Sequence, residues 1–324
     1  MPMKLLIRIL WLWLCIGLAH AGLPPNAKCI APAKPGGGFD LTCQLIRDSL
    51  QASGATRTPI GLAYQPGGIG AMAFNNVVTQ HPADGTAVIA FSSGSLLNLA
   101  QGRFGPYTAA NVQWLYSVGM DYGVIAVRQN APYKNLAQLV TALHEAPQKI
   151  VFGAGGSIGS QDWFKAALLA RSAGISHKTM RFVAFEGGGE ALSALSGDHV
   201  HVLAGDAAEV GLQIDQGAKV KVLAVLADKR LPGRWAHVPT AKEQGYDIRW
   251  PILRGVYLGP AVSDAQRQEW AEAISRASMH PQFGQLLGRA GLERKILTGA
   301  DLEQQVQRQI TEYRQLAHDF GILR

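Results

Sequence analysis

Short apolar segments alternate with amphipathic segments along most of the chain, and glycine, proline or aspartate separates them. An apolar run predicts a buried strand, and an apolar residue at every third or fourth position predicts a helix. The predicted strands are 29–33, 60–65, 86–92, 122–127, 149–152, 181–185, 200–203 and 220–226. Two predicted helices begin near residues 41 and 71, and three others span 135–145, 161–173 and 190–196. This alternation predicts an α/β fold with parallel-rich sheets and ligands at the carboxyl ends of the strands.

The pattern changes after residue 229, where Pro232, Pro239 and Pro251 interrupt it and two long helices, roughly 264–278 and 300–318, close the chain. About 300 residues favour two domains over one. We expect one lobe to combine residues 22–122 with 228–324 and the other to comprise 123–227. The chain then crosses between the lobes twice, and the two crossings form a hinge.

The first 21 residues have the pattern of a secretory signal peptide. Lys4 and Arg8 precede an apolar core at 9–19, and Ala19-His20-Ala21 forms a cleavage site. The apolar run is shorter than the roughly 20 residues that a membrane-spanning helix needs. We therefore expect cleavage after Ala21 and a protein located in the periplasm.

Only Cys29 and Cys43 follow the predicted cleavage site. An oxidising compartment favours a disulfide between them. However, Cys29 starts a strand and Cys43 lies in the first turn of the next helix, so the two sulfurs could also be too far apart. A disulfide and two buried thiols both remain open.

The net charge of the chain indicates which class of ligand or macromolecule it binds. The formal charge of +7 becomes +5 when Lys4 and Arg8 leave with the signal peptide, and the excess is spread out without a Lys/Arg run. Nucleic acid is therefore excluded as a partner, whereas an anionic solute suits the balance. No cofactor and no metal are expected.

Three glycine-rich turns each connect a predicted strand to a predicted helix, at 35–38, 153–159 and 187–189. Glycines there let backbone N–H groups approach a ligand, and the amino end of the following helix attracts an anion. These turns predict a cleft for a carboxylate or phosphate. The candidate contacts are Gly36, Gly37, Gly38, Phe39, Gly155, Gly187 and Gly188, with Ser92 and Ser93 at a strand end. Asp40 is expected to be the N-cap of the first helix.

The second turn also matches a G-x-S-x-G pattern at Gly155–Gly159, as in the nucleophile elbow of hydrolases. No His-Gly-Gly oxyanion motif precedes it. We therefore interpret Ser157 and Ser160 as hydroxyl groups that face the ligand, and we keep a secreted serine hydrolase built on Ser157 as an alternative.

Several motifs in the same order resemble a known family. They are Pro35-Gly36-Gly37-Gly38-Phe39-Asp40, Pro66-Gly67-Gly68-Ile69-Gly70, Ala83-Asp84-Gly85, Phe185-Glu186-Gly187-Gly188-Gly189 and Val238-Pro239-Thr240. Together they are similar to the extracytoplasmic receptors of tripartite tricarboxylate transporters, also called Bug proteins, over essentially the whole chain after the signal peptide. The resemblance implies a two-lobed, type II-like periplasmic-binding fold, no enzymatic activity and a monomer. It also implies delivery of the ligand to large and small membrane permease subunits.

Within that family, the segment 29–43 and the Trp250–Gly255 motif look most like the tricarboxylate-binding (TctC-type) members. Lys34 stands where many members have an apolar residue, and Arg254 has the planar fork that suits a carboxylate. We therefore predict that both cations neutralise the carboxylates of citrate or a related tricarboxylate. A receptor for another carboxylate and a ligand-presenting partner of a sensor kinase are the alternatives.

Overall fold

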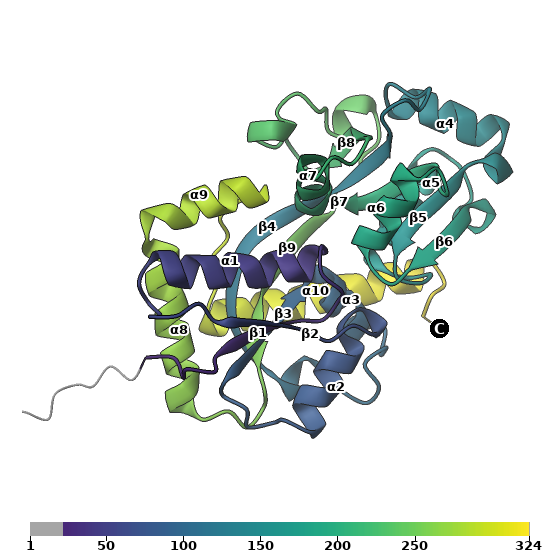
Figure 1. Cartoon of the computed structure of the whole chain (residues 1–324). Coiled ribbons are helices and arrows are strands. Elements are labelled where there is room, and N and C mark those ends of the chain that lie inside the picture. The colour runs from purple at the N-terminus through teal and green to yellow at the C-terminus, as the bar shows by residue number, and fades with distance from the viewer. Residues whose placement is uncertain (1–21, 324) are drawn as a thin grey trace, which may run out of the picture.

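A computed structural model describes residues 22–323, and the predicted signal peptide at 1–21 lies outside this range. One long strand, β4 (Gln113–Arg128), connects the two halves of a mixed sheet with strand order β2-β1-β3-β9-β4-β7-β5-β6, and β8 also pairs with β4 (Figure 1). The other strands are β1 (Lys28–Ala31), β2 (Gly61–Tyr64), β3 (Ala87–Ser92), β5 (Val151–Gly155), β6 (Arg181–Phe185), β7 (Val202–Asp206), β8 (Val220–Leu226) and β9 (Pro251–Leu258).

The partners of β4 change in its middle. Up to Tyr122 the strand pairs with β9, and from Gly123 onward it lies between β7 and β8. Strands β1, β2 and β3 pair in parallel in one half, and β5, β6 and β7 pair in parallel in the other. The predicted α/β class with parallel-rich sheets is therefore confirmed. The predicted lobe boundary falls at the residue where β4 changes partners.

Helices cover both faces of the sheet and bury its apolar side chains. In the first half, α1 (Gly38–Ala52), α8 (Asp264–Met279) and α9 (Pro281–Ala290) pack on one face. The opposite face is covered by α2 (Ala71–Thr79) and α3 (Ser93–Ala100), and in the second half by α4 (Leu136–Glu145) and α5 (Gln161–Ser172). Helices α6 (Gly188–Ser196) and α7 (Ala207–Asp215) pack on the remaining face of the second half.

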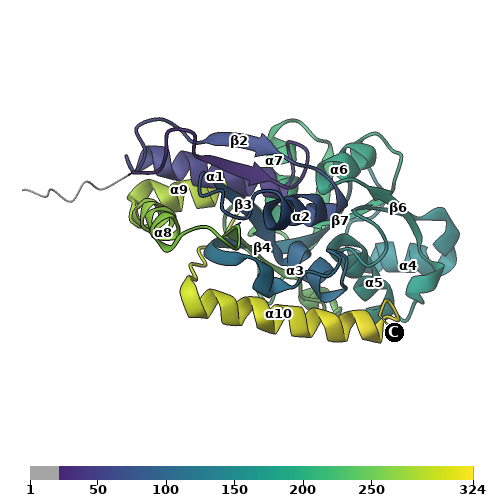
Figure 2. The same ribbon diagram turned by 90° about the horizontal axis from the view of Figure 1, so that it is seen from below.

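The C-terminal helix α10 (Gly299–Asp319) runs beneath both halves (Figure 2). Its buried residues recur at helical spacing, and they are Leu302, Val306, Gln309, Ile310, Tyr313 and Ala317. Just beyond its end, the ring of Phe320 lies 5.4 Å from that of Phe164 on α5. Because Gln309 in the middle of α10 accepts a hydrogen bond from Ser93 of α3, and Phe320 lies against α5, this helix connects the cores of the two halves.

The pattern after residue 229 was only partly predicted. The two long closing helices are confirmed as α8 and α10. Strand β9 was missed because Pro251 marked the region as a loop, although proline is tolerated as the first residue of a strand. Strand β4 begins at Gln113, nine residues before the strand predicted at 122–127.

Cys29 and Cys43 form a disulfide in the structure. The chain turns back after β1, so α1 packs over that strand and the two Cα atoms lie 5.5 Å apart. The alternative of two separate thiols therefore does not describe this structure.

We predict that reducing this disulfide lowers the free energy of unfolding by about 3 kcal/mol, because the bond closes a loop of roughly 15 residues in the unfolded chain. Guanidinium unfolding with and without dithiothreitol measures the change. The Cys29→Ser/Cys43→Ser variant should match the reduced protein and ignore the reductant. A wild type that is equally stable in both buffers would contradict the prediction.

Candidate functional site

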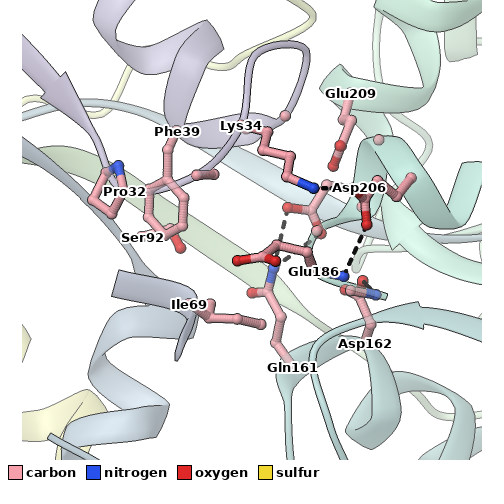
Figure 3. Close-up of a pocket in the computed structure, with 18 of the residues that line it drawn as sticks. Pro32, Lys34, Phe39, Ile69, Ser92, Gln161, Asp162, Glu186, Asp206 and Glu209 are labelled. Carbon is pink, nitrogen blue, oxygen red and sulfur yellow. Dashed lines mark hydrogen bonds and ion pairs between the residues drawn. The ribbon is translucent and has the colours of Figure 1, made fainter. Parts of the chain in front are cut away.

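The three glycine-rich turns meet at one pocket between the two halves of the sheet (Figure 3). The pocket holds about 710 Å³ of empty space including its opening to solvent, which is the size of a small-molecule site. The loop before α1 and Ser92 line it from one half. Gly155, the turn before α6 and the start of α7 line it from the other half.

Two helices present uncapped amino ends to this pocket. Gly37 is the N-cap of α1 and Gly187 is the N-cap of α6, and neither end has a side-chain hydrogen bond. Both glycines and the residues that follow them line the pocket. The first N–H groups of each helix are thus available to a ligand, and the two positive helix ends come from opposite halves of the sheet.

Asp40 is not the N-cap of α1, so this prediction was wrong. The glycine run allows the helix to begin at Gly38, which places Asp40 within the first turn. Its carboxylate accepts hydrogen bonds from the Gly36 N–H at 2.8 Å and from the Tyr64 hydroxyl at 2.9 Å. Asp40 therefore fixes the shape of the glycine loop, in which Gly36 has a φ of 89°.

Most of the predicted site residues surround the pocket. Those that line it are Lys34, Gly37, Gly38, Phe39, Ser92, Gly155, Gly187, Gly188 and Arg254. Gly36, Ser93, Ser157 and Ser160 are not among the lining residues. Ser93 instead accepts a hydrogen bond from the Leu253 N–H inside the core, and Ser160 caps α5.

Ser157 does not line this pocket but a neighbouring hollow, together with Arg103. Its hydroxyl accepts a hydrogen bond from the Arg103 guanidinium at 3.1 Å. Arginine stays protonated and cannot take a proton from serine. This contact therefore gives no support to the hydrolase alternative.

A chain of buried charges forms the floor of the pocket. Arg254 on β9 bonds to Asp121 on β4 and, at 2.8 Å, to Asp206 at the end of β7. Lys165 Nζ on α5 lies 2.6 Å from Asp206 Oδ1 and 2.7 Å from Asp162 Oδ1, so it links the two carboxylates. No side chain fits at Gly38, because a Cβ at this position would clash with the Arg254 guanidinium.

The members of this chain control one another's ionisation. Burial opposes the charge on Arg254 and Lys165, but their acidic neighbours outweigh it and raise the pKa of both cations. Burial likewise opposes the charge on Asp206, yet Lys165 and Arg254 hold its pKa below the usual range. Both cations thus stay charged, and both are already paired with protein carboxylates.

Glu209, in the first turn of α7, has a different environment. It is 6% exposed, and its Oε1 atom has no hydrogen-bond partner within the described residues. Burial raises the pKa of this carboxyl well above its usual value, and nearby Asp206 and Asp162 raise it further. In Figure 3 its carboxyl group points into the pocket.

Side chains also link the two halves across the mouth of the pocket. Lys34 Nζ lies 2.6 Å from Glu190 Oε1 in the first turn of α6. On another side, the Gln101 amide donates to the Gly159 carbonyl at 2.8 Å, next to the Arg103–Ser157 bond. These contacts hold the two halves together beside the pocket.

Sequence reasoning missed the acidic residues of the pocket. Asp206 ends a buried strand, which was a usable signal for a site. Asp162 and Glu209 lie in first turns of helices, where acidic residues are common because they interact with the helix dipole. No local pattern distinguishes them from ordinary helix starts.

Comparison with known proteins gives a consistent result. Residues 60–322 match the model of the family described as "Tripartite tricarboxylate transporter family receptor". The chain is 22% identical to a UPF0065 protein of Bordetella pertussis, over 99% of this chain and 98% of that protein.

Two solved structures share the fold. One is MatC of Rhodopseudomonas palustris with bound malate, with a TM-score of 0.76 and 20% identity over 90% of this chain and 98% of that one. The other is Rpa4515 of R. palustris with adipate, with a TM-score of 0.81 and 18% identity over 91% of this chain and 97% of that one. Across residues 22–323, the helices are all too short or too polar to cross a membrane.

We predict that Arg254→Ala destabilises the protein by about 3–5 kcal/mol, because it leaves the buried carboxylates of Asp121 and Asp206 without their shared cation. Urea unfolding monitored by circular dichroism measures the loss. Arg249→Ala is the matched control, since Arg249 pairs with Asp228 at the half-exposed surface and should change stability little. Equal effects of the two substitutions would refute the structural role of the buried chain.

We also predict a pH-dependent effect of Glu209→Gln. The raised pKa means that the folded protein binds a proton more tightly than the unfolded chain, so the wild type loses stability as pH rises above about 4. Glutamine has no such cost. The variant should match the wild type near pH 4 and become progressively more stable than it toward pH 7, as measured by urea unfolding at each pH. A constant difference at all pH values would argue against a raised pKa.

Proposed function

The chain belongs to the tripartite tricarboxylate transporter receptor family, whose members are periplasmic solute-binding receptors, and we propose that it captures a small organic carboxylate in the pocket between its two lobes. The protein would bind its ligand without chemical change and deliver it to the integral membrane subunits of a tripartite transporter. A sensor kinase as a further partner stays a sequence-based alternative.

One observation carries this proposal, namely that the uncapped amino ends of α1 and α6 line one pocket from opposite halves. A carboxylate held between them would accept hydrogen bonds from both. The malate and adipate bound by the two R. palustris proteins support this ligand class. Because the identities are low, they leave the particular carboxylate open.

Closure of two lobes is the proposed mechanism. We infer that residues 22–122 with 228–324 form one lobe and residues 123–227 form the other, so that the hinge includes the point in β4 between Tyr122 and Gly123. A ligand that touches both helix ends favours the closed form, which the Lys34–Glu190 and Arg103–Ser157 contacts also favour. The permease would then recognise this closed form.

Citrate, the ligand predicted from the sequence, depends on free positive charge at Lys34 and Arg254. Lys34 is paired with Glu190, and Arg254 is paired with Asp121 and Asp206. Little positive charge remains to compensate a third carboxylate. We therefore treat citrate as a comparison ligand for the experiment and a smaller carboxylate as the better candidate.

We predict that Lys34→Ala weakens the binding of citrate and of succinate by the same modest factor, because the lost contact with Glu190 affects closure and not one particular carboxylate. Isothermal titration calorimetry of the purified protein, unfolded and refolded to remove bound ligand, measures both. A much larger loss for citrate would support the tricarboxylate hypothesis instead. If citrate, succinate, malate and adipate all fail to bind to the wild type, the proposed function is wrong.

A further inference from the structure

We propose that the ligand carries a protonated amine close to its carboxylate, and that Glu209 is the residue that binds this ammonium group. The inference rests on the proposed function, because it specifies which carboxylates the same pocket accepts. Glu209 would then determine specificity by direct contact with the ligand.

The first observation is that, among residues 22–323, two buried hydrogen-bond acceptors of the pocket have no donor within hydrogen-bond distance. Glu209 Oε1 and Gln161 Oε1 are both buried and have no hydrogen-bond partner within the described residues. The Gln161 amide nitrogen donates to both carboxylate oxygens of Asp206 at 3.2 and 3.3 Å, which directs its carbonyl oxygen away from Asp206. A buried acceptor without a partner destabilises a protein unless a ligand satisfies it. An ammonium group has three donors for such a position.

The second observation is the balance of charge around the pocket. Its lining contains five acidic side chains, Asp162, Glu186, Glu190, Asp206 and Glu209, and two cations, Lys34 and Arg254. Lys165 behind the lining compensates Asp162 and Asp206, but acidic groups remain in excess. The chain as a whole is basic, so this acidic lining is a local feature. A ligand with only negative groups would add to the repulsion, whereas an ammonium group offsets it.

Glu209 also lies close to the helix ends that would hold the carboxylate. A Cβ on Gly188 would lie 2.8 Å from Glu209 Cδ, and a Cβ on Gly37 would lie 3.5 Å from Glu209 Oε1. The unsatisfied acceptor is therefore adjacent to the first N–H groups of both α1 and α6. A ligand whose amine and carboxylate are separated by one or two carbons, as in an amino acid, would reach both the acceptor and the helix ends.

A metal ion held by the protein is the other way to supply positive charge. Within residues 22–323, no group of three His, Cys, Asp or Glu side chains is arranged to hold a metal ion. Within the described residues, the unpaired acceptors of the pocket are one carboxyl oxygen of Glu209 and the amide oxygen of Gln161. This arrangement suits an N–H donor better than a metal, and we assign the charge to the ligand itself.

The inference includes a defined proton transfer. Burial favours the protonated form of Glu209 in the empty pocket, where Asp162 and Lys165 on α5, Asp206 on β7 and Arg254 on β9 are the charged groups that act on it. Lys34, Glu186 and Glu190 complete the ionisable lining. When the ammonium group arrives, it stabilises the carboxylate, so Glu209 releases its proton to solvent and the ligand keeps its own.

The experiment uses pairs of ligands that differ by one amino group, namely L-aspartate with succinate and L-glutamate with glutarate. Each is titrated calorimetrically into refolded wild type, Glu209→Gln and Glu303→Gln. Glu303 is exposed on α10, which makes it the matched control. In the wild type and the control, the amino member of a pair should bind about 10- to 100-fold more tightly, the range for a hydrogen bond to a charged group. In Glu209→Gln this preference should be lost.

Titrations of the wild type at neutral pH, in buffers with different ionisation enthalpies, should further show that binding of the amino ligand releases a proton. The Glu209→Gln variant should release no proton. The inference is overturned if succinate or glutarate binds as tightly as its amino partner, or if Glu209→Gln keeps the preference. It is also overturned if binding takes up a proton, which would mean that Glu209 donates its own proton to a carboxylate.

If no member of either pair binds, but citrate, malate or adipate does, only this inference fails. If none of these carboxylates binds, the proposed function fails as well.

Discussion

The buried chain of charges from Asp121 through Arg254, Asp206 and Lys165 to Asp162 is the interaction on which the rest of the structure depends. Removing five charges from water is costly, and each is tolerated only because the next one compensates it. Its members come from β4, β9, β7 and α5, so they meet only when the two halves of the sheet are correctly joined. The same contacts fix the floor of the pocket, and the position of Arg254 requires glycine at residue 38.

This constraint determines what the pocket can bind. Because protein carboxylates are already paired with both buried cations, backbone N–H groups are the main donors that we propose for a ligand carboxylate. The uncapped ends of α1 and α6 offer these groups from opposite halves, so a ligand held by both ends would favour the proposed closure of the lobes. Within the described residues Glu209 Oε1 is left without a partner beside them, which gives the pocket both a region for negative charge and a region for positive charge.

The parts of this account that depend on local sequence could be predicted. Strand–helix alternation indicated the fold class, and the glycine turns indicated where the pocket lies, because each signal is contained within a few neighbouring residues. The charge chain could not be found in this way, since Arg254 is separated from Asp121 by 133 positions and Lys165 from Asp206 by 41. Arg254 was therefore interpreted as a free cation, and Asp40 was assigned to the wrong position in the first helix because three glycines conceal where that helix begins.

A crystal structure of the protein with a bound carboxylate tests the central claim most directly. The account predicts that the carboxylate lies between the amino ends of α1 and α6 and accepts hydrogen bonds from N–H groups of both, with the Arg254 ion pairs intact. A ligand that instead displaces Asp206 or Asp121 from Arg254, or that binds beside Arg103 and Ser157 outside the pocket, would contradict the account.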